Sequence, residues 1–72
     1  MSQSDKLAKL MKDGLKLYYQ ILKLHSKQLP PGKIRNLGNV YVKYEFRQHH
    51  SAPDPHFYEQ FYNKWVQYKK EL

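Results

Sequence analysis

A chain of 72 residues forms at most one domain, because chains of this size bury only about 60% of the surface that the unfolded form exposes. A small core argues against a deep catalytic cleft, and the absence of cysteine excludes disulfides and thiolate metal sites. The formal net charge of +7 favours an anionic partner, which by composition alone is nucleic acid, acidic protein or anionic lipid. Seven tyrosines, three phenylalanines and one tryptophan predict surfaces that are fully buried only in a complex.

The N-terminal part of the chain is predicted to form an amphipathic helix from Leu7 onward. Apolar side chains and one histidine recur at spacings of three and four residues, which is typical of one helix face. This face comprises Leu7, Leu10, Met11, Leu15, Tyr18, Ile21, Leu22 and His25. Ser2 or Ser4 is expected to cap the helix, with Asp5 near its positive end. Residues 29–32, Leu-Pro-Pro-Gly, are predicted to end it.

The middle segment, residues 34–50, fits two patterns. An alternation of apolar and polar residues indicates a half-buried strand, with Val40, Val42, Tyr44 and Phe46 on one side. A helical stripe is present as well, formed by Leu37, Val40, Tyr41, Tyr44 and Gln48. We favour a helix, because the chain offers no second strand with which a lone strand would pair.

The C-terminal part is predicted to form a third helix that starts at Pro53-Asp54-Pro55. This sequence places an aspartate at the N-cap and a proline at the first helical position. Helical spacing then continues through Tyr58, Phe61, Tyr62, Trp65, Tyr68 and Leu72, with Phe57 beside this stripe. The predicted fold is therefore all-α, a three-helix antiparallel bundle in a single domain spanning residues 1–72.

The titratable residues do not form a recognisable catalytic or metal-binding motif. His25, His49, His50 and His56 lack metal-ligand spacing, and we interpret them as surface or capping residues near helix ends. The six acids are scattered singly, and no glycine-rich phosphate loop is present. We predict a protein that is not an enzyme and that requires no cofactor or metal.

The basic residues of the middle segment leave a nucleic-acid alternative open. Lysines and arginines there alternate with tyrosines that can stack on bases, at Lys33, Arg35, Tyr41, Lys43, Tyr44 and Arg47. A solvated basic face explains the same pattern and is preferred. Nucleic-acid binding would instead fall steeply with salt and be lost when Lys43 and Arg47 are changed to glutamate.

The sequence also bears on localisation. It has no apolar run long enough to span a bilayer and no secretory signal near its start. The lysine-rich segment 1–16 resembles an import signal, although Asp5 and Asp13 and the absence of arginine there favour uncleaved internal targeting.

Several runs of residues resemble the LYR family of small mitochondrial proteins. Leu17-Tyr18-Tyr19 is followed by Leu24-His25 and Leu29-Pro30-Pro31, and then by residues 37–49, Leu-Gly-Asn-Val-Tyr-Val-Lys-Tyr-Glu-Phe-Arg-Gln-His. Within that family the pattern is similar to the succinate dehydrogenase assembly factor 3 group, with Phe61 and Trp65 in its last helix. The resemblance covers residues 15–70. It departs at Tyr19, which replaces the arginine of the LYR motif and supplies neither its charge nor its bidentate fork.

The resemblance implies an LYR-type bundle in the mitochondrial matrix, peripheral to the inner membrane, that binds the iron–sulfur subunit of succinate dehydrogenase. The wider family binds the acidic mitochondrial acyl carrier protein, which a +7 chain would attract. The expected contact residues are Leu17, Tyr18, Tyr19, Tyr41, Lys43, Glu45, Phe46 and Arg47. An alternative role is that of a permanent subunit of a respiratory complex or mitoribosome.

Overall fold

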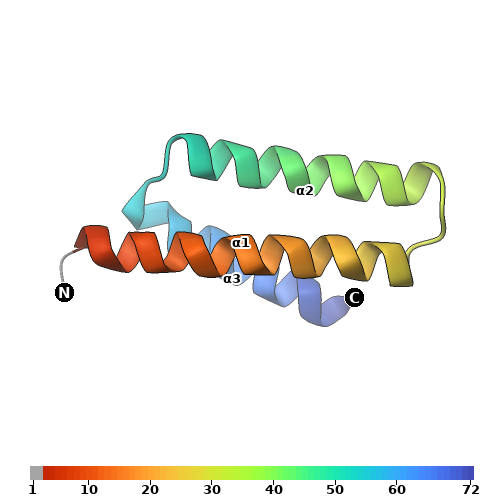
Figure 1. Cartoon of the computed structure of the whole chain (residues 1–72), viewed down its shortest axis with the longest axis horizontal. Coiled ribbons are helices and arrows are strands. Elements are labelled where there is room, and N and C mark those ends of the chain that lie inside the picture. Colours follow the sequence, from red (N-terminus) through yellow and green to blue (C-terminus); the bar gives the residue numbers. More distant parts are fainter. Residues whose placement is uncertain (1–2) are drawn as a thin grey trace.

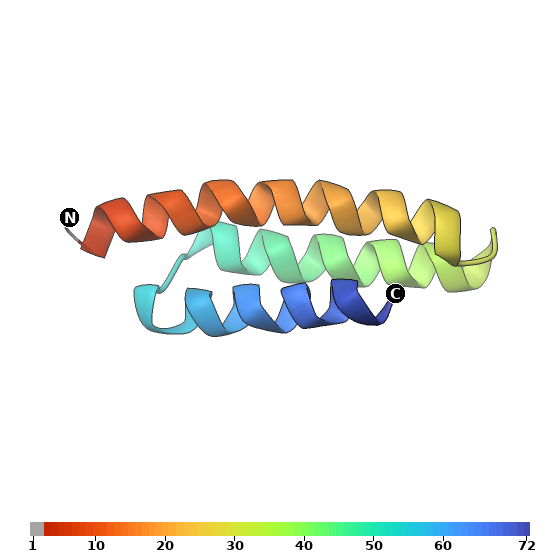
Figure 2. The same ribbon diagram turned by 90° about the horizontal axis from the view of Figure 1, so that it is seen from below.

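The computed structural model describes residues 3–72, which form three helices joined by two short connections. Helix α1 spans Gln3–Gln28, α2 spans Lys33–Ser51 and α3 spans Pro55–Glu71. The three helices lie side by side, with α2 antiparallel to α1 and α3 returning in the direction of α1 (Figures 1 and 2). The described part contains no strand, so the all-α prediction is confirmed, including the helical interpretation of the middle segment. No helix in residues 3–72 combines the length and the apolar character needed to cross a bilayer.

The core lies where all three helices meet, and most of it is aromatic. α3 contributes three large rings, and both α2 and α3 pack against α1. The buried apolar residues are Leu17, Ile21, Val42, Phe46, Tyr58, Phe61 and Trp65. Phe46 connects α2 to α3, because its ring centroid lies 4.8 Å from that of Phe61 and 5.7 Å from that of Trp65. Tilted and edge-to-face pairs of this kind contribute about 0.5–1.5 kcal/mol each beyond the area they bury.

The connection between α1 and α2 is held by one arginine. Arg35 donates from Nη2 to the carbonyl oxygens of Ser26 and Leu29, both at 2.8 Å, and from Nε to Leu29 at 3.2 Å. These carbonyls lie at the end of α1, where the helix leaves its last acceptors without backbone partners. Gly32, the N-cap residue of α2, has a φ of 116°, a value that favours glycine. The predicted Pro-Pro-Gly break is thus confirmed, and Arg35 is committed to the fold.

The start of α3 has the predicted chemistry. Asp54 is the N-cap, its carboxylate accepts from the backbone N–H of His56 at 2.9 Å, and Pro55 occupies the first helical position. For α1, the expected cap Ser2 lies outside the described residues, and Ser4 lies within the helix.

α1 and α3 lie close together at Gly14. A Cβ at this position would collide with the hydroxyl of Tyr58. Tyr58 is fully buried, and its hydroxyl forms a 2.6 Å hydrogen bond with Nε2 of His50. Glycine therefore lets a tyrosine ring enter the core and still reach a polar partner.

The interpretation of the histidines as surface or capping residues is wrong for His25. Its side chain is completely buried, with Nδ1 2.9 Å from Oδ1 of Asn39 and Nε2 2.6 Å from the hydroxyl of Tyr68. His25 therefore connects α1 to both α2 and α3. Burial is possible because both ring nitrogens have partners, which removes the usual cost of a buried polar group.

Candidate interaction surface

The helical stripe predicted for α2 exists, but it faces away from the core. Its members Leu37, Val40, Tyr41 and Tyr44 are at least half exposed, and Gln48 is exposed too. Ile34, 60% exposed, extends the same face by one turn. We call Ile34, Leu37, Val40, Tyr41 and Tyr44 the outer face of α2. The inward side of α2 is instead set by Val42 and Phe46, four residues apart.

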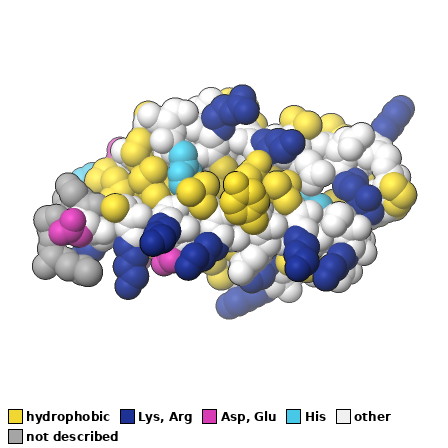
Figure 3. Space-filling model, in the orientation of Figure 1, with side chains coloured by type: hydrophobic (Ala, Val, Ile, Leu, Met, Phe, Trp, Pro, Cys, Tyr) yellow, Lys and Arg dark blue, Asp and Glu magenta, His cyan; other side chains and the backbone are white. Residues whose placement is uncertain are grey.

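A second feature is the groove between α1 and α2. It encloses about 400 Å³ and is lined by Leu15, Tyr18, Lys43, Phe46, Arg47 and His50. In the view of Figure 3, hydrophobic side chains form a band along the boundary of the two helices, bordered on both sides by Lys and Arg. Tyr18 lines the groove, with its ring centroid 5.2 Å from that of Phe46 and 5.4 Å from that of Tyr19. Such a groove can hold an apolar group whose charged end is negative.

A polar cluster lies on the side of α2 that faces α3, away from the α1–α2 groove. Lys64 Nζ lies 3.8 Å from Glu45 Oε1 and donates to the Tyr41 hydroxyl at 3.3 Å. It also sits 5.5 Å from the centre of the Trp65 ring, within the range of a cation–π contact. His49 approaches Glu45 to 4.0 Å and stacks on Phe61 with 4.0 Å between ring centroids. Glu45 is therefore already paired within the chain.

The electrostatics of the aromatic core are set by burial. Burial, and to a lesser extent repulsion by His49, lowers the pKa of His50 below its ordinary value of 6.5. Burial, with a smaller effect of Tyr62, raises the pKa of Tyr58 to about 12. Burial also raises the pKa of Tyr68. These hydroxyls stay protonated at neutral pH and act as hydrogen-bond donors and acceptors.

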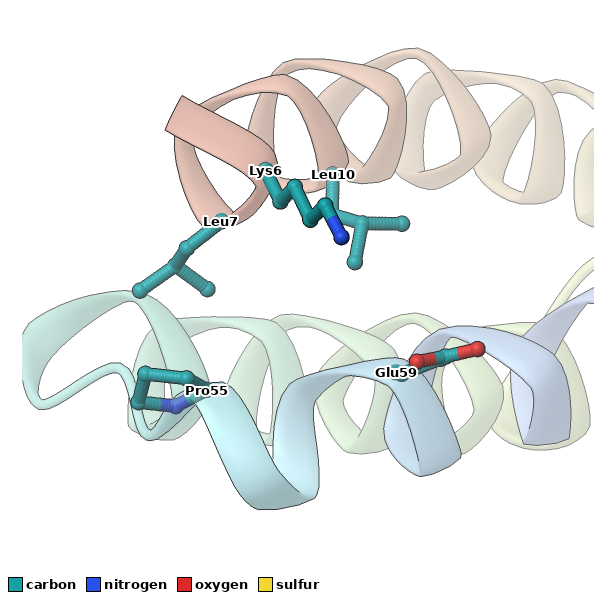
Figure 4. Close-up of a pocket in the computed structure, with 5 residues that line it drawn as sticks. All are labelled: Lys6, Leu7, Leu10, Pro55 and Glu59. Carbon is teal, nitrogen blue, oxygen red and sulfur yellow. The ribbon is translucent and has the colours of Figure 1, made fainter. Parts of the chain in front are cut away.

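A further pocket of about 360 Å³ lies between the start of α1 and the start of α3. Leu7 and Leu10 point from α1 toward Pro55 and Glu59, and Lys6 lies beside them (Figure 4). One lysine and one glutamate provide no catalytic set. Within residues 3–72, no three His, Asp or Glu side chains converge in a way that would hold a metal ion.

The expected contact residues fall into three places. Leu17 and Phe46 are each 4% exposed and belong to the core. The α1–α2 groove brings together Tyr18, Lys43 and Arg47, with Tyr19 next to them on α1 and 66% exposed. Tyr41, at the edge of the outer face, and Glu45 both lie beside Lys64 of α3. Sequence reasoning detected the stripe on α2 but not its outward direction, and it did not include Ile34, Leu37, Val40 or Tyr44 among the contact residues.

Comparisons with known proteins agree on one family. The model of the Complex1_LYR-like family matches residues 15–72. Three curated proteins named "Succinate dehydrogenase assembly factor 3, mitochondrial" are similar to the chain. The Aspergillus fumigatus protein is 40% identical over 81% of this chain and 44% of its own length. The Emericella nidulans protein is 41% identical over 78% and 41%, and the Candida albicans protein 38% over 81% and 47%.

The chain thus spans less than half the length of these curated relatives. No solved structure matches it significantly.

Proposed function

The chain belongs to the Complex1_LYR-like family, and from this membership we propose that it is a mitochondrial assembly factor that holds the iron–sulfur subunit of succinate dehydrogenase. It acts by binding and carries out no reaction. The name shared by the relatives supports the link to succinate dehydrogenase, and we propose the iron–sulfur subunit as the part of that enzyme that is bound.

The observation that carries the proposal is the outer face of α2. Five large apolar side chains, each at least half exposed, lie on one side of a single helix. Monomeric proteins rarely expose a continuous apolar surface of this kind, and where one occurs it usually marks a site of protein contact. Two of the five are tyrosines, which are enriched where an interface is buried.

The proposed contact extends from this face to its neighbours. Tyr41 is on the outer face, while Lys43 and Arg47 are exposed on the adjacent side of α2 toward α1. Tyr18 and Tyr19 continue the surface on α1, and Glu45 contributes from the α3 side. Leu17 and Phe46 act indirectly, because they fix the positions of α1 and α2 from inside the core.

The mitochondrial acyl carrier protein is a second proposed partner. The α1–α2 groove has an apolar floor and basic residues at its rim, Lys43 and Arg47, which suits an acidic protein that carries an alkyl chain. Each buried methylene would contribute about 0.8 kcal/mol. Tyr19 provides no cation where the LYR motif has arginine, so Lys43 and Arg47 would supply the charge.

We place the protein in the mitochondrial matrix, beside the inner membrane. The names of the relatives support a mitochondrial location. The alternative role, a permanent subunit of a respiratory complex or mitoribosome, is supported by the loss of the motif arginine, because a subunit would not need the carrier site. Isolation from mitochondria in mild detergent separates the two roles. The assembly factor comes with the unassembled iron–sulfur subunit, whereas a resident subunit comes in equimolar amounts with a finished complex.

Calorimetry with the purified iron–sulfur subunit tests the contact directly. Leu37→Asp places a charge in the outer face, at a side chain that is 69% exposed, so folding should be preserved. We expect the affinity to fall by at least about 30-fold, the effect of a 2 kcal/mol interface residue.

Phe57→Asp is the matched control, because Phe57 is 59% exposed and lies on α3. It should change the affinity by less than about threefold. Equal losses in the two variants would show that the outer face is not the contact. A wild-type chain that is folded and does not bind the subunit would remove the proposed function itself.

A further inference from the structure

The outward side of α1 carries a row of lysines. Positions 12, 16, 23 and 27 are all lysine, and on an α-helix they fall within an arc of about 60°. All four are exposed, and the row extends over about 22 Å of helix. We call Lys12, Lys16, Lys23 and Lys27 the α1 lysine face. Figure 3 shows a series of dark blue side chains along α1, on the border of the hydrophobic band that faces away from α2.

The charges of this face are not neutralised within the described chain. Glu45 pairs with Lys64 and His49, and none of these four lysines forms an ion pair with a described residue. Between Lys12 and Lys27 the only acid on α1 is Asp13. Asp13 and Lys16 border a hollow that is also lined by Tyr62 and Val66, so this single acid lies at the α3 edge of the lysine row. A single-sign field of this kind attracts a surface of opposite charge.

Apolar side chains run beside the lysines. Leu15 is 46% exposed and Tyr19 is 66% exposed, and both lie between the α1 lysine face and the groove. Tyr18 and Leu22 are half-buried and continue this strip toward α2. α1 thus presents two parallel strips along its length, one cationic and one aliphatic and aromatic.

We propose that α1 docks on an anionic lipid bilayer, lying parallel to the membrane plane. In this arrangement the α1 lysine face binds lipid phosphates, and Leu15 and Tyr19 enter the boundary between headgroups and acyl chains. Interfacial helices have this division of basic and apolar faces, and tyrosine concentrates at that depth. Docking on the surface requires no membrane-spanning segment.

The residue types favour a bilayer over an acidic protein or a nucleic acid. α1 contains no arginine, and its exposed basic residues are lysines, which carry a flexible point charge. Specific recognition of carboxylates and phosphates favours the rigid fork of arginine. Leu15 and Leu22 cannot form hydrogen bonds or ion pairs with a phosphodiester backbone or a base. Their transfer from water to the acyl chains of a bilayer is favourable. The lysines form a single row along the outward side of α1, an arrangement that suits a flat surface.

Co-sedimentation with vesicles tests the charge requirement. The purified chain should bind vesicles of equal parts phosphatidylcholine and phosphatidylglycerol, and bind phosphatidylcholine vesicles far less. Changing Lys12, Lys16 and Lys23 to glutamine should weaken binding to the anionic vesicles on the order of 100-fold, about fivefold per lysine.

The matched control changes Lys6, Lys33 and Lys70 to glutamine. These lysines are also exposed and lie away from the α1 lysine face. Their replacement lowers the net charge by the same three units. The control should retain most of the wild-type affinity. Equal losses in both triple variants would reduce the effect to net charge and overturn the proposal.

Fluorescence tests the orientation. Tyr19→Trp and Tyr44→Trp place a reporter at two sites of similar exposure, 66% and 61%, on α1 and on the outer face of α2. Trp65 is 1% exposed and gives a constant background. Anionic vesicles should shift the emission of Tyr19→Trp to shorter wavelength and leave that of Tyr44→Trp unchanged. A shift in the second variant alone would show that another face meets the lipid.

Two soluble polyanions test whether an acidic protein or a nucleic acid binds the α1 lysine face instead of a membrane. If the wild-type chain does not bind anionic vesicles but binds poly-glutamate, the α1 lysine face is a protein contact. If it binds a single-stranded oligonucleotide more tightly than vesicles, the face serves nucleic acid. Either result overturns the proposal. These tests use the chain alone, so their outcome does not depend on succinate dehydrogenase.

Discussion

The two sides of α2 carry the same kinds of residue and have opposite surroundings. Val42 and Phe46 are 1% and 4% exposed and hold α2 against the other helices. Val40 and Tyr44, each two residues earlier along the same helix, are 63% and 61% exposed. The inner side therefore contributes to the stability of the isolated chain, whereas the outer side can contribute only once a partner covers it. Apolar character alone does not distinguish core from interface in a domain this small.

The strongest test of this difference removes one aromatic ring from each side. Phe46→Ala should lower the free energy of unfolding by about 3–5 kcal/mol, because it opens a cavity among Phe61, Trp65 and Tyr18. Tyr44→Ala should change it by no more than about 0.5 kcal/mol, as expected for an exposed side chain. Urea unfolding followed by circular dichroism measures both. Similar losses would mean that the outer face of α2 already takes part in the fold.

A buried polar side chain of α1 should also contribute to stability. His25→Leu preserves volume but leaves the side chains of Asn39 and Tyr68 without their partner. We expect a loss of about 1–3 kcal/mol. Tyr68→Phe removes only the hydroxyl and should cost less. If His25→Leu were as stable as wild type, the three-helix hydrogen-bond network would contribute nothing net.

The helices and their ends could be predicted from the sequence because their causes are local. Asp54 at the N-cap and Pro55 at the first helical position indicate the start of α3. Pro30 and Gly32 mark the break before α2. The direction of a helix face is not local. In α2 the sets containing Leu37 and Phe46 both have helical spacing, and only the packing of α1 and α3 decides which one is buried.

Single residues within the candidate site were harder to predict. Leu17 was expected to contact a partner because of its place in the LYR-like run, but it is buried in the core that the three helices form together. The partners of His25 come from positions 14 and 43 residues away. Spacing within one helix cannot reveal such pairings. Gln48, counted with the apolar stripe, is simply its exposed continuation.

The contact between α1 and α3 offers a smaller and more specific test. Gly14→Ala should lower the free energy of unfolding by about 1–2 kcal/mol, because the new methyl group collides with the Tyr58 hydroxyl. In a Tyr58→Phe background the hydroxyl is gone and the nearest remaining atom is Cζ at 3.3 Å, so the same change should cost much less. The helix preference of alanine over glycine, about 1 kcal/mol, acts in the same direction. The double-mutant cycle therefore isolates the close approach. Equal costs in both backgrounds would place the strain elsewhere.

The smallest expected effect concerns His50, which lies at the edge between the inner side of α2 and the α1–α2 groove. Its pKa is lowered in the folded chain, mainly by burial, whereas the unfolded chain keeps a value near 6.5. As the pH falls through 6.5, the unfolded state takes up a proton before the folded state does, so stability is lost over the interval down to the folded pKa. Above pH 6.5 the contribution is complete.

Replacing the imidazole should remove this dependence. In His50→Gln, the free energy of unfolding should fall less than in wild type when the pH is lowered through 6.5, while the glutamine amide still offers Tyr58 a hydrogen-bond partner. His56→Gln removes an exposed histidine and serves as the control, which should keep the wild-type pH profile. If His50→Gln also kept that profile, His50 would be open to solvent in solution. It would then belong with the outer, partner-accessible positions and not with the inner side of α2.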